Sequence, residues 1–246
     1  MRSIKDICYC EENGLCLDIH LPDCDEFPVF LYFHGGGLES GNKAGRKEVF
    51  ETFCKLGIGV VSADYRLYPT AKYPDFLEDS AKATAWVYNN IKNYGNVKKI
   101  FVGGSSAGGY ISQMLCFDNS WLKKYGISPL DFDGFILDAG QPTSHFNVLR
   151  EKGLDTRRVI VDETAPLYFV GLNEKYPPMF IIYSDNDMEN RPEQTVLLVS
   201  TLRHFGHIDN VVLKEMHGTH CQYVFDKDEN GDSIFAKIVL EYIKGV

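Results

Sequence analysis

The stretch Phe101-Val-Gly-Gly-Ser-Ser-Ala-Gly-Gly-Tyr110 decides how the rest of the chain is interpreted. It follows a short apolar run and leads into a helical pattern, as a strand-to-helix connection does. Within it, Gly104-Ser-Ser-Ala-Gly108 fits G-x-S-x-G, a sharp turn that presents one serine above a sheet. Glycine stands two residues to either side of that serine because larger side chains would collide across so tight a bend. Ser106 meets this requirement, whereas Ser105 would need glycine where Ala107 stands.

Two other kinds of glycine-rich site have a different spacing. A dinucleotide-binding fingerprint, G-x-G-x-x-G, that begins at Gly103 or Gly104 meets a serine where it needs its second glycine. A phosphate-binding P-loop would need lysine at the position of Gly109. The remaining alternative is a turn of small residues that packs a helix against a strand and has no chemical role.

The composition predicts one folded domain over residues 1–246. Hydrophobic residues make up 44% of the chain and charged residues 24%, as in an ordinary globular domain. The formal net charge of −9 argues against a nucleic acid or an anionic membrane as partner. We also expect no membrane span, because no apolar run approaches the ~20 residues that cross a bilayer.

The cysteines and the first residues bear on cellular location. The number of cysteines, seven, is odd, and four of them crowd the N-terminal part without forming a C-x-x-C pair: Cys8, Cys10, Cys16 and Cys24. We expect reduced thiols in a cytoplasmic protein rather than disulfides or a metal site. Residues 1–12 have no uninterrupted apolar core and no small-residue cleavage site, so they are not expected to form a signal peptide.

Apolar strands alternate with amphipathic helices along the chain. Short apolar runs predict strands at 29–33, 58–63, 100–102, 134–138, 180–184 and 211–213, and helical patterns cover 74–95, 191–206 and 234–242. Near the N-terminus, Asn13-Gly14 lies between two strand patterns and predicts a hairpin with a type I′ turn. The expected fold is α/β, with a mostly parallel sheet, helices on both faces and the antiparallel hairpin at one edge.

Residues 141–178 interrupt the strand–helix alternation. The segment is too long for a simple connection, and insertions of this length in compact domains are usually functional loops or lids. Its apolar side chains are sufficient to cover a pocket: Phe146, Leu149, Leu154, Leu167, Tyr168 and Phe169. We therefore expect a small cap inserted into the single domain.

Polar residues with catalytic potential follow several of the predicted strands. Ligand sites of open parallel sheets lie at the carboxyl ends of strands. A serine nucleophile needs a base within hydrogen-bond reach and a third group that orients the base. The acids and histidines that follow later strands, and are candidates for these roles, are Asp185, Asp187, His217 and His220.

The stretch His34-Gly-Gly-Gly37 follows the strand at 29–33. A tetrahedral intermediate carries negative charge on the former carbonyl oxygen, and backbone N–H groups must already point towards it. Glycine allows the backbone to present its amides without a Cβ in the way. We assign the oxyanion donors to Gly36, Gly37 and Ala107, and we expect His34 to have a structural hydrogen bond rather than a catalytic role.

The chain resembles an α/β-hydrolase of the hormone-sensitive-lipase-like esterase group, and more closely its small acetyl- or feruloyl-esterase-like members. The segments that carry the resemblance follow in the family's order and spacing: Leu17-Asp-Ile-His-Leu-Pro22, His34-Gly-Gly-Gly37, Asp64-Tyr-Arg-Leu-Tyr-Pro69, Tyr73-Pro-Asp-Phe-Leu-Glu-Asp79, Gly104-Ser-Ser-Ala-Gly-Gly109, Pro177-Pro-Met-Phe-Ile-Ile-Tyr-Ser-Asp-Asn-Asp187 and Gly218-Thr-His220. The resemblance implies the catalytic triad Ser106, Asp187 and His220. Asp185 follows its strand directly, so we expect its carboxylate to bond within its own turn.

The resemblance implies a serine carboxylesterase that hydrolyses small or short-chain esters through an acyl-enzyme. It implies no metal or organic cofactor, and its partner is a small-molecule ester. An aryl-formamidase or small peptidase would use the same residues and is an alternative. A catalytically silent hydrolase fold that serves for binding is another. The larger members have N-terminal lid helices with no counterpart in this sequence, which favours short acyl chains.

Overall fold

The computed structural model describes residues 1–246 and contains one eight-stranded sheet. The strand order is β1-β2-β4-β3-β5-β6-β7-β8. Strands β3 to β8 are parallel, and the hairpin of β1 and β2 joins β4 antiparallel. The strands span Arg2–Cys10, Leu15–Leu21, Glu26–Phe33, Gly59–Ala63, Asn96–Ser105, Gly134–Asp138, Met179–Ser184 and Val211–Met216. The expected α/β architecture with an antiparallel edge is confirmed.

Helices cover both faces of the sheet. One face packs against α1 (Lys47–Lys55), α7 (Gln222–Phe225) and α8 (Ile234–Gly245), and the other against α2 (Asp75–Asn90), α3 (Ala107–Phe117) and α6 (Arg191–His204). Alternation along a strand supplies both cores: Phe30 and Tyr32 of β3 belong to the first, and Leu31 and Phe33 to the second. Shorter helices are α4 (Ser120–Lys123), α5 (Phe146–Glu151) and 3₁₀ turns at Glu11–Asn13, Ile91–Asn93, Pro129–Asp131, Pro166–Phe169 and Ile208–Asn210.

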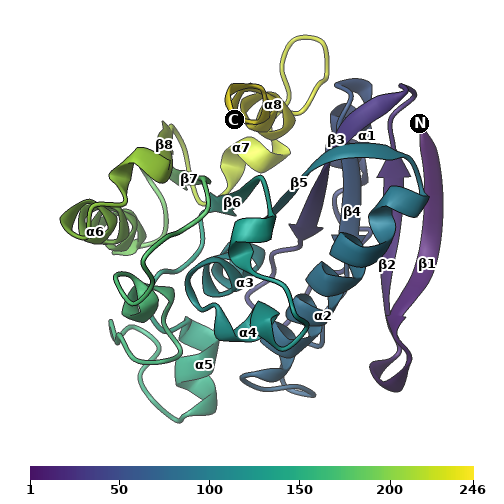
Figure 1. The fold of residues 1–246 in the computed structure, drawn as a ribbon. Helices are drawn as coiled ribbons and strands as arrows, with labels where there is room; N and C mark the ends of the chain where they lie inside the picture. Colours follow the sequence, from purple (N-terminus) through teal and green to yellow (C-terminus); the bar gives the residue numbers. More distant parts are fainter.

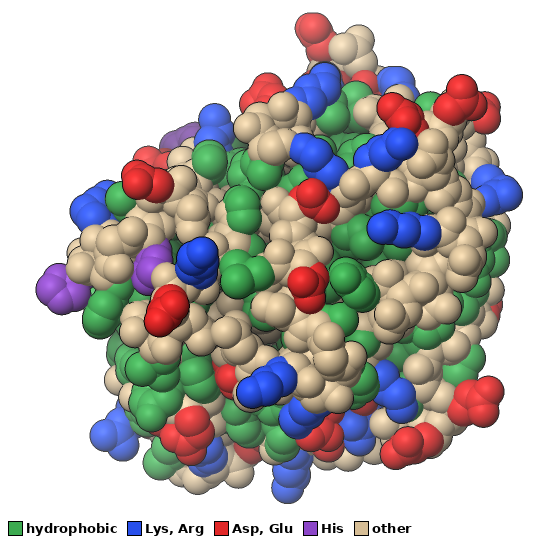
Figure 2. Space-filling view, in the orientation of Figure 1, with side chains coloured by type: hydrophobic (Ala, Val, Ile, Leu, Met, Phe, Trp, Pro, Cys, Tyr) green, Lys and Arg blue, Asp and Glu red, His purple; other side chains and the backbone are tan.

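The hairpin lies at one end of the molecule, and β8 with α6 lies at the other (Figure 1). Acidic and basic side chains are interspersed over the face seen in Figure 2. No helix is long and apolar enough to cross a membrane. All seven cysteines are free thiols.

The turn of the hairpin differs from the prediction. Type I′ needs positive φ at both central residues, but only Gly14 has it, with φ 63°. Glu11–Asn13 instead form a 3₁₀ turn that Gly14 ends in the left-handed conformation, so that Cys10 pairs with Leu15. The predicted hairpin is present, with a connection of four residues.

Residues 141–178 connect β6 to β7 and contain α5 and the 3₁₀ turn at Pro166–Phe169. The remainder is irregular but tied together, since Ser144 N donates to Ile160 O and Leu167 N to Pro142 O at 2.9 Å each. This segment lies at the carboxyl edge of the sheet, where β6 ends and the candidate site begins.

Candidate active site

Ser106 occupies the turn between β5 and α3 in a conformation that non-glycine residues rarely adopt, with φ 57° and ψ −113°. Its N–H donates to the carbonyl of Asp138 at 2.9 Å. A Cβ on Gly104 would lie 2.3 Å from the carbonyl oxygen of Phe33, and a Cβ on Gly108 would lie 1.9 Å from the same atom. The two glycines are therefore required by close approach of the turn to the end of β3.

The structure brings together the three residues Ser106, His220 and Asp187. His220 Nδ1 lies 2.6 Å from Asp187 Oδ1, and His220 Nε2 lies 2.8 Å from Ser106 Oγ. A carboxylate accepts hydrogen bonds, so Nδ1 carries the proton and Nε2 is left to accept from the serine hydroxyl. The Asp187 side chain is fully buried, and its Oδ1 also accepts from Met188 N at 2.6 Å. These contacts hold the imidazole in one orientation.

Asp185 and His217 form a separate pair at the surface. His217 Nδ1 lies 2.6 Å from Asp185 Oδ2, and Gly218 N donates to Asp185 Oδ1 at 2.9 Å. The expectation that Asp185 bonds within its own turn is wrong, because its carboxylate reaches across to the loop that follows β8. The backbone N–H of Gly218 lowers the pKa of Asp185, and Asp185 raises the pKa of His217. This pair anchors the loop that carries His220.

The glycine loop after β3 lies against the serine turn. Gly36 and Gly37 have φ of 120° and 66°, and a Cβ on Gly36 would lie 2.1 Å from Ser40 O. The backbone N–H groups of Gly36, Gly37 and Ala107 donate no hydrogen bond within the chain. Three amides at the expected oxyanion positions are thus left free to bind an incoming oxygen.

His34 is held within the loop by its neighbours. Its ring stacks on Tyr65 with 4.3 Å between centroids, and its Nδ1 donates to Gly35 O at 2.8 Å. Burial lowers its pKa. These contacts agree with a structural side chain that fixes the glycine loop.

Sequence reasoning missed a buried acid beneath the serine turn. Asp138, the last residue of β6, is fully buried and accepts a hydrogen bond from the hydroxyl of Tyr223. Burial raises the pKa of Asp138 to about 6. Tyr223 lies three residues after His220, so this bond links the histidine loop to the strand whose carbonyl holds Ser106. The sequence did contain a signal for this residue. Asp138 is an acid at the end of an apolar strand, and that strand lies beside the one that leads to the serine.

The segment 141–178 contacts the glycine loop. Asn147 Nδ2 donates to Gly37 O at 2.8 Å, and Arg150 pairs with Glu39 at 2.5 Å. A Cβ on Gly37 would lie 3.1 Å from the Phe146 ring. The start of α5 therefore fixes one wall of the site.

A cavity of about 700 Å³ extends from this wall towards the acid loop. Polar and charged side chains dominate its lining: Gln141, Phe146, Thr156, Arg157, Arg158, Met188, Glu189, Asn190, Arg191, Glu193 and Gln194. Arg191 is 5% exposed, and its Nε makes no hydrogen bond. No group of three or more His, Cys, Asp or Glu side chains is arranged to hold a metal ion.

Comparison with known proteins places this geometry in a family. The family model described as alpha/beta hydrolase fold matches residues 30–197. Esterase LipI of Mycobacterium tuberculosis is 40% identical over 100 residues, which cover 38% of this chain and 30% of that protein. The 3-O-acetylpapaveroxine carboxylesterase CXE2 of Papaver somniferum is 33% identical over 192 residues, covering 68% of this chain and 58% of that protein. The chain thus spans less than two thirds of the length of each of these relatives.

A solved structure described as a truncated form of carbohydrate esterase from gut microbiota superposes with a TM-score of 0.80. It is 18% identical in sequence, and the match covers 100% of this chain and 96% of that one. At this identity the likeness concerns the fold, and it extends over the whole chain.

Proposed function

Because the chain belongs to the family with the alpha/beta hydrolase fold, we propose that it is a serine carboxylesterase acting on small or short-chain esters. The observation that carries the proposal is the continuous hydrogen-bonded series Asp187–His220–Ser106 at the carboxyl edge of the sheet. A serine joined to a base that is itself oriented by a buried acid is the arrangement that activates a weak nucleophile.

Acylation begins when Ser106 Oγ attacks the ester carbonyl carbon and its proton passes to His220 Nε2. The imidazolium that forms is stabilised by Asp187, which keeps the Nδ1 proton in place. His220 then gives the Nε2 proton to the leaving alkoxide, the ester C–O bond breaks, and an acyl-Ser106 ester remains. The contacts at 2.6 and 2.8 Å provide this route without any rearrangement of the three side chains.

The negative charge of the tetrahedral intermediate is stabilised by hydrogen bonds from the backbone amides of Gly36, Gly37 and Ala107. Their N–H groups are free of internal partners, so they need not break a hydrogen bond to bind the oxyanion. Losing one such donor typically costs about 2.7–4 kcal/mol of transition-state stabilisation. In deacylation, water attacks the acyl carbon, His220 accepts the proton of that water, and the same amides hold the second oxyanion. The bond between the acyl carbon and Ser106 Oγ then breaks, and His220 Nε2 returns the proton to Oγ, which releases the carboxylic acid and restores the serine.

The cavity beside Phe146 and Met188 supports a preference for short acyl groups. A long alkyl chain placed there would cover exposed charged side chains of the lining, such as Arg158, Glu189 and Glu193, without giving them a partner, and burying a polar group in that way is unfavourable. A short acyl group leaves these side chains hydrated.

Residues 141–178 would act as the small cap of the site. The support is the contact of Phe146 and Asn147 with Gly37, which joins this segment to the proposed oxyanion donors.

The proposal is tested by hydrolysis of 4-nitrophenyl esters with acyl chains of two to twelve carbons, with the purified whole chain and its Ser106→Ala variant. We expect turnover that is fastest with acetyl or butyryl esters and is abolished by the substitution. A matched set of formyl and acetyl anilides separates the amidase alternative. Equal rates for wild type and Ser106→Ala, or faster cleavage of amides than of esters, would refute the proposal.

A further inference from the structure

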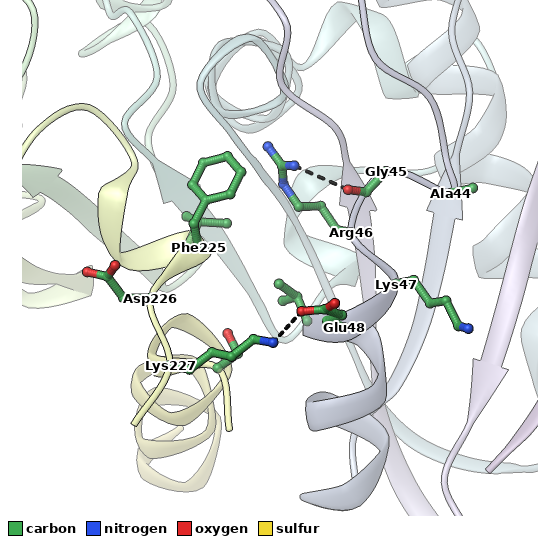
Figure 3. A pocket seen from close by; sticks show the side chains of 11 residues that line it. Ala44, Gly45, Arg46, Lys47, Glu48, Phe225, Asp226 and Lys227 are labelled. Carbon is green, nitrogen blue, oxygen red and sulfur yellow. Dashed lines mark hydrogen bonds and ion pairs between the residues drawn. The ribbon is translucent and has the colours of Figure 1, made fainter. Parts of the chain in front are cut away.

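A second cavity, of about 260 Å³, lies between α1, α7 and the start of α8 (Figure 3). The chain runs from β3 through α1 into the parallel strand β4, so the first residues of α1 lie at the carboxyl edge of the sheet. Helix α7 follows His220 after one residue, and its last two residues, Val224 and Phe225, line the cavity. The cavity therefore opens at the same edge as Ser106.

Arg46 is the cation of this cavity that has no counter-charge. It forms no ion pair; its Nε is buried without a hydrogen bond, and its Nη1 donates only to Gly45 O at 3.2 Å. Its guanidinium lies 4.2 Å from the centroid of the Phe225 ring, a side chain that is 60% exposed. Figure 3 shows the guanidinium directly beside the ring.

The other cations of the lining are already paired. Lys227 contacts Glu48, as Figure 3 also shows, and Lys47 pairs with Glu51 at 3.6 Å. Arg46 therefore remains the unpaired cation of the lining, in a chain whose formal charge is −9. Asp226, the other charged residue of the lining, accepts a hydrogen bond from Gln222 Nε2 at 3.4 Å. A single guanidinium matches a singly charged carboxylate better than a doubly charged phosphate.

The positive charge of Arg46 also affects the pKa values of two groups near the proposed triad. It contributes to the lowered pKa of His34, for which burial is the main cause, and it opposes the rise that burial gives to the pKa of Cys221. Cys221 follows His220, and its Sγ lies 3.7 Å from His220 Nε2. A group bound to Arg46 would lie beside the histidine loop, because α7, which lines the cavity, follows Cys221 directly.

We infer that this cavity binds a carboxylate of the substrate, with Arg46 as its ligand and the Phe225 ring as an apolar wall beside it. The planar guanidinium suits a carboxylate because it offers two parallel N–H donors. The inference rests on the proposed esterase function and narrows it to esters that carry a negative charge on their acyl or alcohol part.

Two pairs of esters test the inference and locate the charge. In the first pair, 4-acetoxybenzoate is compared with its methyl ester, and the charge lies on the alcohol. In the second, the mono-4-nitrophenyl ester of adipic acid is compared with its methyl-capped diester, and the charge lies on the acyl group. The wild type is expected to prefer the charged member of one pair by at least about tenfold in kcat/KM, the size of effect that a charge-assisted hydrogen bond supports.

Arg46→Gln is expected to abolish that preference. Lys47→Gln removes the same unit charge at the rim of the cavity and is expected to keep it within about twofold. Arg46→Lys keeps the positive charge but lacks the planar donors, so its preference for the charged ester is expected to lie between those of the wild type and Arg46→Gln. This variant tests the inference if Arg46→Gln fails to fold. Preference for the neutral ester in both pairs, or full preference in Arg46→Gln or Arg46→Lys, overturns the inference. Hydrolysis of none of the four esters would instead refute the proposed function.

Discussion

The hydroxyl of Ser106 lies 2.8 Å from Nε2 of His220, although 114 positions separate the two residues in the chain. Each stands just beyond the carboxyl end of a parallel strand, Ser106 after β5 and His220 in the loop after β8. The parallel strands therefore set the relative position of the two residues, and the loops complete the approach of their side chains.

The first prediction concerns the acid. Asp187→Asn should lower kcat by orders of magnitude, because an amide in place of the carboxylate favours the wrong tautomer of His220; the loss is about 10⁴ in the best-studied serine protease. Asp185→Asn is the matched control, since it removes a carboxylate two residues away that bonds His217 and Gly218. It should lower the melting temperature slightly and retain most of kcat. Ester hydrolysis of both variants, after circular dichroism shows that they are folded, decides the matter; an inactive Asp185→Asn beside an active Asp187→Asn would exchange the two roles.

The second prediction concerns the loop that carries Gly37. Asn147→Ala removes the hydrogen bond from the buried amide to Gly37 O and should lower kcat by roughly tenfold with little change in KM, because a loosened donor mainly affects the transition state. Arg150→Ala, three residues further along α5, breaks an exposed pair with Glu39 and should leave kcat within about twofold. Steady-state kinetics with 4-nitrophenyl acetate measures both. A rise in KM alone for Asn147→Ala would show that the loop binds substrate without favouring the transition state.

The third prediction concerns the close approach of the serine turn to β3. Gly104→Ala would place a Cβ 2.3 Å from Phe33 O, where neither backbone can give way, so it should destabilise the fold by about 3 kcal/mol or more. Gly245→Ala, at the open end of α8, meets no atom within 4 Å and should be neutral or slightly stabilising. Urea unfolding compares them. Equal midpoints for the two variants would mean that the turn has room for a side chain.

The fourth prediction concerns pH. Burial raises the pKa of Asp138 to about 6, against 3.8 for an exposed aspartate. Between these values the unfolded chain has released the proton and the folded chain still holds it, so this group makes stability fall as pH rises from about 4 to 6. The contribution is at most about 3 kcal/mol above pH 6. Asp138→Asn removes the titrating carboxyl group. The free energy of unfolding of the variant, measured in urea, should therefore fall less than that of the wild type between pH 4.5 and 7. Parallel curves for the two proteins would contradict the raised pKa.

The arrangement of the fold followed from local patterns because each apolar run ends at a polar or glycine-rich stretch. By that rule Ser106, Asp187 and His220 lie at one edge of the sheet. The link from Asp138 to Tyr223 could not be predicted in this way, since it joins β6 to a short helix 85 positions later and depends on tertiary packing.

Two local predictions failed for a related reason. Asn13-Gly14 suits a two-residue turn, but Glu11–Asn13 form a 3₁₀ turn and the connection lengthens. Asp185 could bond its own turn, but the N–H of Gly218 and the ring of His217 lie nearer in the folded chain. In each position the sequence allowed more than one set of hydrogen bonds, and neighbouring segments selected among them.

The central claim, that Ser106 is the nucleophile, is tested most directly by reaction with a fluorophosphonate followed by mass spectrometry of the whole chain and of its peptides. We expect a single adduct on the peptide that contains Ser106, with ester hydrolysis lost in proportion to labelling, and no adduct in Ser106→Ala or when His220 is replaced by alanine. Hydrolysis that continues when Ser106 is fully labelled, or inactivation with the adduct on another residue, would contradict it.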